Sequence, residues 1–199
     1  MKYSSQLKAF LFILCLYPLG RLVWLAYTGQ MGANPIELIT RSLGAWTLVF
    51  LLITLSITPV RRLSGWAWLL KLRRMAGLYA FFYALLHFAT YVWLDQFFDL
   101  SSIFMDVIKR PFITIGFAAF ILLIPLAITS TNAMVKRLGG KRWQQLHKLV
   151  YVIAIFGVLH YWWLVKKDIT QPLIYAAVLV LLLSYRLVMS RLNTKQKVK

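Results

Sequence analysis

Six segments of this 199-residue chain are apolar over nearly the length that a helix needs to cross a membrane. A spanning helix requires about 20 mostly apolar residues, with its backbone hydrogen bonds satisfied internally. These segments predict an all-α fold, a polytopic bundle of six transmembrane helices that forms one domain over residues 1–199. They run from Ala9 to Thr28, Leu43 to Val60, Met75 to Leu94, Pro111 to Ile128, Leu149 to Val165 and Pro172 to Met189.

Composition excludes the main soluble classes. Charged residues make up 14% of the chain and hydrophobic residues 61%, against about 25% and 45–50% in soluble domains. The net charge of +18 does not indicate nucleic-acid binding, because the aromatic residues lie in apolar runs and are not interleaved with the basic clusters. Cys15 is the only cysteine, so an internal disulfide is excluded and a thiolate metal cluster is implausible.

The charges fall on two sides of the expected membrane. One side, with both termini, carries 17 basic residues and no acidic one, whereas the other carries five basic residues and all five acids. Cytoplasmic loops collect Lys and Arg, so we expect both termini inside (N-in/C-in) in a bacterial inner membrane. The 17 inner basic residues are Lys2, Lys8, Arg61, Arg62, Lys71, Arg73, Arg74, Lys136, Arg137, Lys141, Arg142, Lys148, Arg186, Arg191, Lys195, Lys197 and Lys199.

Two of the three histidines lie at the same expected depth. His87 is 12 residues into the third segment and His160 is 13 residues beyond His147, where the fifth segment enters the membrane. At ~1.5 Å per residue, both sit roughly 18–20 Å from the inner edge. Imidazoles at one depth on two helices can bind opposite faces of a haem. The alternative is that both histidines only form hydrogen bonds between helices, whereas a bare metal site would lack ligands.

Small neighbours leave room for a macrocycle beside these histidines. Ala84 and Ala80 lie three and seven residues before His87. Gly157 and Ala154 lie three and six residues before His160. The pattern favours haem ligation by His87 and His160, although small residues are common in membrane helices.

His147 lies at the inner end of the fifth segment, about 20 Å along the axis from His160. On a continuous helix the two would point about 140° apart, and no histidine matches His147 on the third segment. It is therefore an interfacial residue, a contact to a second haem, a partner of a haem propionate, or a contact to a flavin phosphate. Arg74 and Arg142 are candidate inner cofactor contacts, and Arg21 is a candidate contact to a haem propionate on the outer side.

Two further features are the end of the second span and the outer loop after the third. Pro59, followed by Val60 and two arginines, is expected to end the second span. The outer loop from Asp95 to Arg110 has apolar residues at helical spacing, which predicts either an interfacial helix or a docking surface for a partner.

The six segments, the histidine of the third and the run from Arg142 to Tyr151 (RWQQLHKLVY) followed by His160 resemble the ferric-reductase-like transmembrane domain. The small size is closest to the haem-binding membrane subunits of periplasmic methionine-sulfoxide reductase systems. The resemblance implies haem b held by His87 and His160, with His147 as a third candidate ligand. It also implies an association with FMN and electron transfer to an MsrP-like periplasmic molybdenum-cofactor enzyme that reduces methionine sulfoxide in proteins.

No G-x-G-x-x-G or P-loop is present, and no nucleophile–base arrangement stands out. We therefore expect an electron-transfer subunit that is not catalytic on the final substrate by itself. Its electrons would come from quinol or a cytoplasmic flavin reductase. Two alternatives remain: a ferric or other metal-ion reductase with the same haem core, and a non-redox membrane anchor.

Overall fold

A computed structural model describes residues 5–165 and 167–197, and all the regular elements in this part of the chain are helical. Lys2, Lys166 and Lys199, which enter the charge count above, lie outside it. The α-helices are α1 (Ser5–Leu14), α2 (Tyr17–Tyr27), α3 (Pro35–Ser64), α4 (Leu70–Thr90), α5 (Leu100–Lys109), α6 (Pro111–Ile128), α7 (Asn132–Leu138), α8 (Gly140–His147), α9 (Leu149–Leu164) and α10 (Thr170–Lys197), with a 3₁₀ turn η1 (Ala67–Leu69) and a π-helical turn η2 (Tyr91–Asp95).

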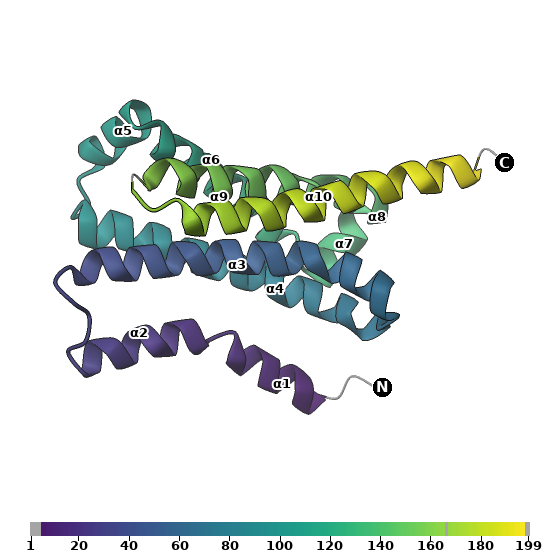
Figure 1. Ribbon diagram of the computed structural model, residues 1–199, viewed down its shortest axis with the longest axis horizontal. Coiled ribbons are helices and arrows are strands. Elements are labelled where there is room, and N and C mark those ends of the chain that lie inside the picture. Colours follow the sequence, from purple (N-terminus) through teal and green to yellow (C-terminus); the bar gives the residue numbers. More distant parts are fainter. Residues whose placement is uncertain (1–4, 166, 198–199) are drawn as a thin grey trace.

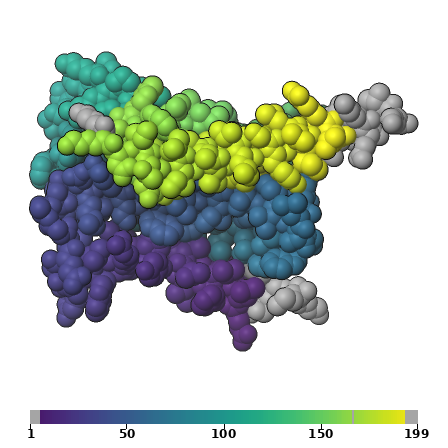
Figure 2. All heavy atoms as spheres, viewed as in Figure 1, coloured from purple at the N-terminus to yellow at the C-terminus, as the bar shows by residue number. Residues whose placement is uncertain are grey.

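Two antiparallel helix pairs form the centre of the bundle (Figure 1). The most extensive packing is between α3 and α4, followed by α6 and α9, and the pairs meet through α4 on α6 and α3 on α9. The shared core contains fully buried residues from three of these helices, among them Leu55, Tyr83 and Ile153. α10 packs on α9 and α3, while α2 packs on α3. The α1–α2 segment and α10 therefore lie on opposite sides of this centre (Figure 2).

The fold is that of a multi-pass membrane protein, as the apolar segments predict. Within residues 5–165 and 167–197, five helical segments are long and apolar enough to cross a membrane, and the bent pair α1–α2 makes up to six. The start of α1 and the end of α10 lie at the same end of the bundle (Figure 1). Large apolar side chains, including Val180 and Leu181, are exposed on the bundle surface, where lipid solvates them.

The first span is broken, whereas the apolar pattern predicts one continuous segment. α1 and α2 are bent by 45°, and Pro18 in the first turn of α2 lacks the N–H that would bond to the carbonyl of Leu14. The hydroxyls of two α4 tyrosines donate to carbonyls at the break: Tyr79 to Phe12 (2.8 Å) and Tyr83 to Cys15 (2.8 Å). Neighbouring side chains thus satisfy the backbone that the bend releases.

The helix that contains the second span continues past Pro59, since α3 runs to Ser64 and is capped by Gly65 in the left-handed conformation (φ 74°). That the span itself ends at Pro59 and Val60 stays a prediction. Pro59 cannot donate to the carbonyl of Leu55. Arg186 of α10 donates to that carbonyl instead through Nη2 (2.7 Å), and its Nη1 donates to the Tyr151 hydroxyl (2.7 Å). A side chain from another helix therefore replaces the hydrogen bond that proline removes.

The loop after the third span contains the helix α5. Asp99 caps it by accepting hydrogen bonds from the backbone N–H groups of Ser101 (3.0 Å) and Ser102 (3.2 Å). Phe97 and Phe98 precede it with positive φ angles of 48° and 62°, which non-glycine residues seldom adopt. Whether lipid or a partner covers its exposed apolar face stays a prediction.

Candidate functional site

His87 of α4 and His160 of α9 face the same pocket, with their ring centres 6.1 Å apart and their planes inclined by 76°. The pocket has a volume of about 340 Å³ and lies between α3, α4, α6 and α9. Two residues separated by 73 positions in the sequence are thus brought to one site by the packing of the two central helix pairs.

The tautomer of each imidazole follows from its hydrogen bond. Nδ1 of His87 lies 2.8 Å from the carbonyl oxygen of Thr40, and Nδ1 of His160 lies 2.7 Å from that of Phe112. A carbonyl can only accept, so each Nδ1 carries the proton and each Nε2 keeps its lone pair. Neither Nε2 forms a hydrogen bond within the described part of the chain. This is the state of a metal-binding histidine, whose other nitrogen donates to a backbone carbonyl.

A glycine lies against each imidazole. A β-carbon placed on Gly44 would lie 3.0 Å from Cε1 of His87, and one placed on Gly116 would lie 2.6 Å from Nδ1 of His160. Gly44 lies four residues after Thr40, whose carbonyl binds His87, and Gly116 lies four residues after Phe112. The two halves of the site therefore repeat one arrangement. The absent side chain lets the ring reach the helix backbone.

These two glycines are not among the site residues expected from the sequence. The signal that could have found them is that a glycine inside an apolar helix weakens it and so requires a packing reason. Both glycines meet that condition, but the sequence does not say which side chain approaches them.

The spacing of the rings fits a haem. Two imidazoles on opposite sides of one metal, each bound at about 2 Å, hold their ring centres roughly 6 Å apart, and the observed distance is 6.1 Å. The pocket walls are mostly apolar and include the small residues Ala84 and Gly157. Ala80 and Ala154, also expected beside the macrocycle, are instead fully buried in the core. Within the described residues no group of three His, Cys, Asp or Glu could hold a bare metal ion.

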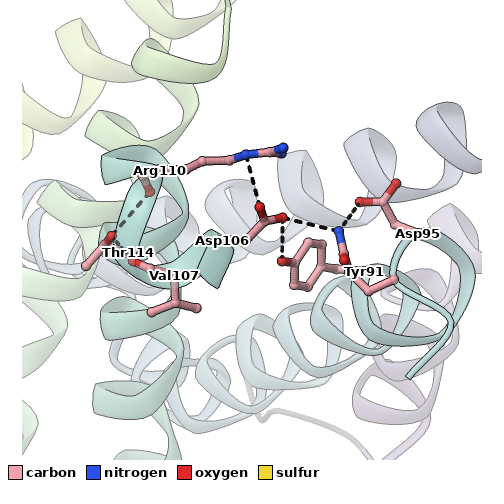
Figure 3. A network of polar contacts seen from close by, with 7 residues as sticks. Tyr91, Asp95, Asp106, Val107, Arg110 and Thr114 are labelled. Atoms are coloured by element: carbon pink, nitrogen blue, oxygen red, sulfur yellow. Dashed lines mark hydrogen bonds and ion pairs between the residues drawn. The ribbon is translucent and has the colours of Figure 1, made fainter. Parts of the chain in front are cut away.

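The polar end of this pocket includes Arg41, Tyr91, Asp95 and Arg110. Asp106 links two of these lining residues, because its carboxylate accepts hydrogen bonds from the Tyr91 hydroxyl (3.1 Å) and from Nε of Arg110 (3.1 Å). Figure 3 shows the hydroxyl and the guanidinium approaching that carboxylate from different directions.

Arg21, the expected propionate contact, is exposed on α2 and does not line this pocket. The arginines that do, Arg41 and Arg110, were not assigned this role from the sequence. The reason is geometric, because only the packed bundle shows which helix ends surround the histidines.

A second pocket of about 240 Å³ lies toward the end of the bundle that carries the basic loops, and His147, Arg73 and Arg74 line it. Leu51 and Leu123 line both pockets, so these two side chains form a shared wall. His147 and Arg74, both expected as cofactor contacts, therefore line the same pocket. Arg142 is exposed on α8 and lies outside the pocket.

His147 is held by contacts with its own helix. Its ring stacks on Trp143 with centres 3.8 Å apart, and its Nδ1 lies 3.0 Å from the Trp143 carbonyl oxygen. Its Nε2 lies 3.5 Å from Oγ of Ser130. Lys148, between the end of α8 and the start of α9, has a right-handed helical conformation (φ −68°, ψ −19°), and α8 and α9 form one candidate span from Gly140 to Leu164. The expected angle of about 140° between His147 and His160 stays a prediction.

Comparison with known proteins gives a family and close relatives. Residues 41–158 match the family described as "Ferric reductase like transmembrane component". That segment contains Gly44, His87, Gly116 and His147 but ends two residues before His160.

Several curated relatives carry the name "Protein-methionine-sulfoxide reductase heme-binding subunit MsrQ". The chain is 62% identical to the protein of Herminiimonas arsenicoxydans over 92% of its own length and 84% of that protein. It is 55% identical to that of Azospira oryzae, with coverages of 92% and 79%, and 56% identical to that of Ralstonia nicotianae, with coverages of 93% and 86%.

Proposed function

Since this chain belongs to the ferric reductase-like transmembrane family and, within it, to the haem-binding MsrQ subunits, we propose that it is a b-type cytochrome of the bacterial inner membrane. It carries electrons across the membrane to an MsrP-like periplasmic molybdoenzyme that reduces methionine sulfoxide in proteins. The observation that carries this proposal is the pairing of His87 and His160 across one apolar pocket, with ring centres 6.1 Å apart and both Nε2 atoms free of hydrogen bonds within the described chain.

His87 and His160 would hold the haem iron. When bound, haem supplies one-electron redox chemistry. The chain's own contribution is to fix the ligands: the Thr40 and Phe112 carbonyls hold each Nδ1–H and so aim each Nε2. The apolar wall excludes water from the site, which stabilises the ligand arrangement and tunes the potential.

The second pocket is the proposed inner relay. A single outer site cannot serve a cytoplasmic donor, because most of the ~30 Å hydrocarbon core would separate them. His147 and Arg74 would contact a second haem or FMN there. Leu51 and Leu123 are the side chains between the two pockets, so no long gap separates the two sites. A quinol bound within the bilayer is the alternative donor.

We propose the N-in/C-in orientation from the charge distribution. The start of α1 and the end of α10 lie at the end of the bundle where α3 ends and α7 lies (Figure 1), and α3 and α7 both have basic residues in their last turn. The positive-inside rule assigns that end to the cytoplasm. The His87–His160 pocket would then open toward the periplasmic acceptor.

The test is a visible absorption spectrum of the purified protein, oxidised and reduced, with haem measured per chain. Wild type is compared with His87→Ala, His160→Ala and His147→Ala. A low-spin b-type spectrum that the first two substitutions abolish is expected. If His147 contacts a second haem, His147→Ala lowers the ratio of haem to chain but keeps the His87–His160 spectrum. A colourless wild type after haem-replete expression contradicts the proposal and favours the membrane anchor.

The family description favours one second candidate, a ferric or other metal-ion reductase with the same haem core. Re-oxidation of the reduced protein separates the two. We expect rapid re-oxidation when an MsrP-like enzyme and methionine sulfoxide are added together. Equal re-oxidation by a soluble ferric complex alone would favour the metal-ion reductase.

A further inference from the structure

The cationic groups that line the histidine pocket gather at one end of it. Among the described lining residues the only Lys or Arg side chains are Arg41 and Arg110. Arg41 follows Thr40, whose carbonyl holds His87, and Arg110 lies two residues before Phe112, whose carbonyl holds His160. Each half of the site therefore contributes one arginine.

Arg41 is positioned from within α3. Its Nη2 lies 2.6 Å from Oε1 of Glu37, one helical turn earlier. The other oxygen of Glu37 accepts from the side-chain amide of Asn34 (3.0 Å), the residue that caps this helix. Only one guanidinium nitrogen of Arg41 is used in these contacts, so the remaining donors can bind an anion in the pocket.

Arg110 is positioned by Asp106. The arginine binds through Nε (3.1 Å), while the other oxygen of the carboxylate accepts from Tyr91 (3.1 Å) and Gln96 (3.2 Å). The Asp106 side chain is 15% exposed and that of Arg110 is 57% exposed. Both terminal nitrogens of Arg110 remain without a partner among the described contacts, and in Figure 3 its guanidinium extends beyond the carboxylate.

We propose that Arg41 and Arg110 receive the two propionate carboxylates of the haem held by His87 and His160. This inference rests on the proposed function. Haem carries both carboxylates on one edge, and each of the two arginines lies next to or two residues from the carbonyl that holds one of the histidines. Guanidinium groups bind carboxylates through paired, charge-assisted hydrogen bonds. Glu37 and Asp106 each pair with one arginine and Asp95 also lines the polar end of the pocket, so the propionates would bind the guanidinium N–H donors that Glu37 and Asp106 leave free.

The chain offers alternatives that the geometry does not favour. Arg21 and Lys109 belong to the same expected outer half, but neither lines the pocket. Both are exposed, on α2 and α5. The two proposed arginines thus fix the haem edge toward the end of the bundle where α5 lies.

The experiment compares haem with haem dimethyl ester, in which both carboxylates are blocked. Each porphyrin is titrated into the full-length apoprotein in detergent, and binding is followed by absorbance. We expect wild type to bind haem about tenfold more tightly than the ester, because partly exposed charged contacts are modest. In the double variant Arg41→Gln/Arg110→Gln this preference falls to near one, while the low-spin spectrum of the paired histidines is retained.

Three further variants make the test specific. Lys167→Gln removes an exposed cation of the outer loop that does not line the pocket and should keep the preference. Arg21→Gln tests the competing position and should also keep it. Arg110→Lys in the Arg41→Gln background should restore part of the preference, since the charge returns without the planar fork.

The reduction potential gives a second readout. Loss of a cation beside the iron favours the oxidised, more positive state, so the double variant should have a lower potential than wild type. An unchanged preference and potential in a double variant that still binds haem through both histidines would overturn this inference alone. A wild type that binds neither porphyrin would overturn the proposed function as well, so the two failures are distinguishable.

Discussion

The imidazole of His160 lies directly against the backbone of Gly116, so that a β-carbon at this position would fall 2.6 Å from Nδ1. The same ring donates to the carbonyl of Phe112 at 2.7 Å. Glycine at residue 116 and the orientation of His160 are therefore one structural requirement, because any side chain there would push the ring away from its acceptor.

Gly116→Ala should abolish or strongly reduce haem binding. The added β-carbon would lie 2.6 Å from Nδ1 of His160, and that nitrogen is held by its hydrogen bond to the Phe112 carbonyl. The contact can therefore relax only if His160 moves. Gly44→Ala should be milder, because its added carbon would meet His87 at 3.0 Å. Haem per chain and the position of the main absorption band measure both effects.

Gly20→Ala is the matched control, since a β-carbon there meets nothing within 4 Å. It should keep full haem content and gain roughly up to 1 kcal/mol in helix stability. A Gly116→Ala protein with wild-type haem content and spectrum would contradict the steric argument.

Tyr83→Phe should loosen the attachment of the broken first span. The hydroxyl of Tyr83 donates to the Cys15 carbonyl at the bend (2.8 Å), and its loss leaves that carbonyl without this donor, at a cost of about 1–2 kcal/mol. Cys15 should then react faster with a maleimide. Tyr175→Phe, which removes a hydroxyl with no described hydrogen bond, should leave that rate unchanged; equal rates in all three proteins would count against the role of Tyr83.

Arg186→Met should destabilise the protein by about 1–3 kcal/mol, because the Leu55 carbonyl loses its donor. Pro59→Ala restores a backbone N–H that can reach the same carbonyl. The double variant should therefore be less destabilised than the sum of the two single changes. Thermal unfolding in detergent measures this coupling, and strict additivity would show that the two residues do not share the carbonyl.

The α5 helix should lose order as the pH falls. Hydrogen bonds from the Ser102 hydroxyl and from the backbone amides of Ser102 and Ser101 lower the pKa of Asp99. A carboxylate whose pKa is lower in the folded state stabilises that state above its unfolded pKa of about 3.9. This stabilisation is lost as the pH falls through the lower folded pKa.

Hydrogen exchange of α5, measured from above pH 4 down to about pH 2, checks this prediction. Asp99→Asn should remove most of the pH step. Asp168→Asn is the matched control, since Thr170 lowers the pKa of Asp168 in a similar local turn before α10. A pH step in α5 that persists in Asp99→Asn would assign the effect to another group.

Much of the fold follows from local patterns. Length and apolarity are properties of consecutive residues, and the structure confirms an all-helical membrane bundle, with five or up to six candidate spans among the described residues. The family resemblance is confirmed as well. Pro59 shows the limit of such patterns. A proline usually ends a helix because it removes one donor, but Arg186 from a segment more than 120 positions away supplies a replacement, and the sequence around Pro59 does not contain that information.

In the candidate site, too, some features follow from local sequence and others depend on how the helices pack. The amino-acid sequence specifies which side chains have the required chemistry and predicts their depth, since helix rise converts spacing into distance. The spacing is enough to single out His87 and His160 as a pair. The packing of the helices specifies which carbonyls hold these rings, which glycines admit them, and that Arg41 and Arg110 rather than Arg21 line their pocket. These relationships depend on the rotation and sliding of helices against each other, which interhelical packing sets across the whole bundle.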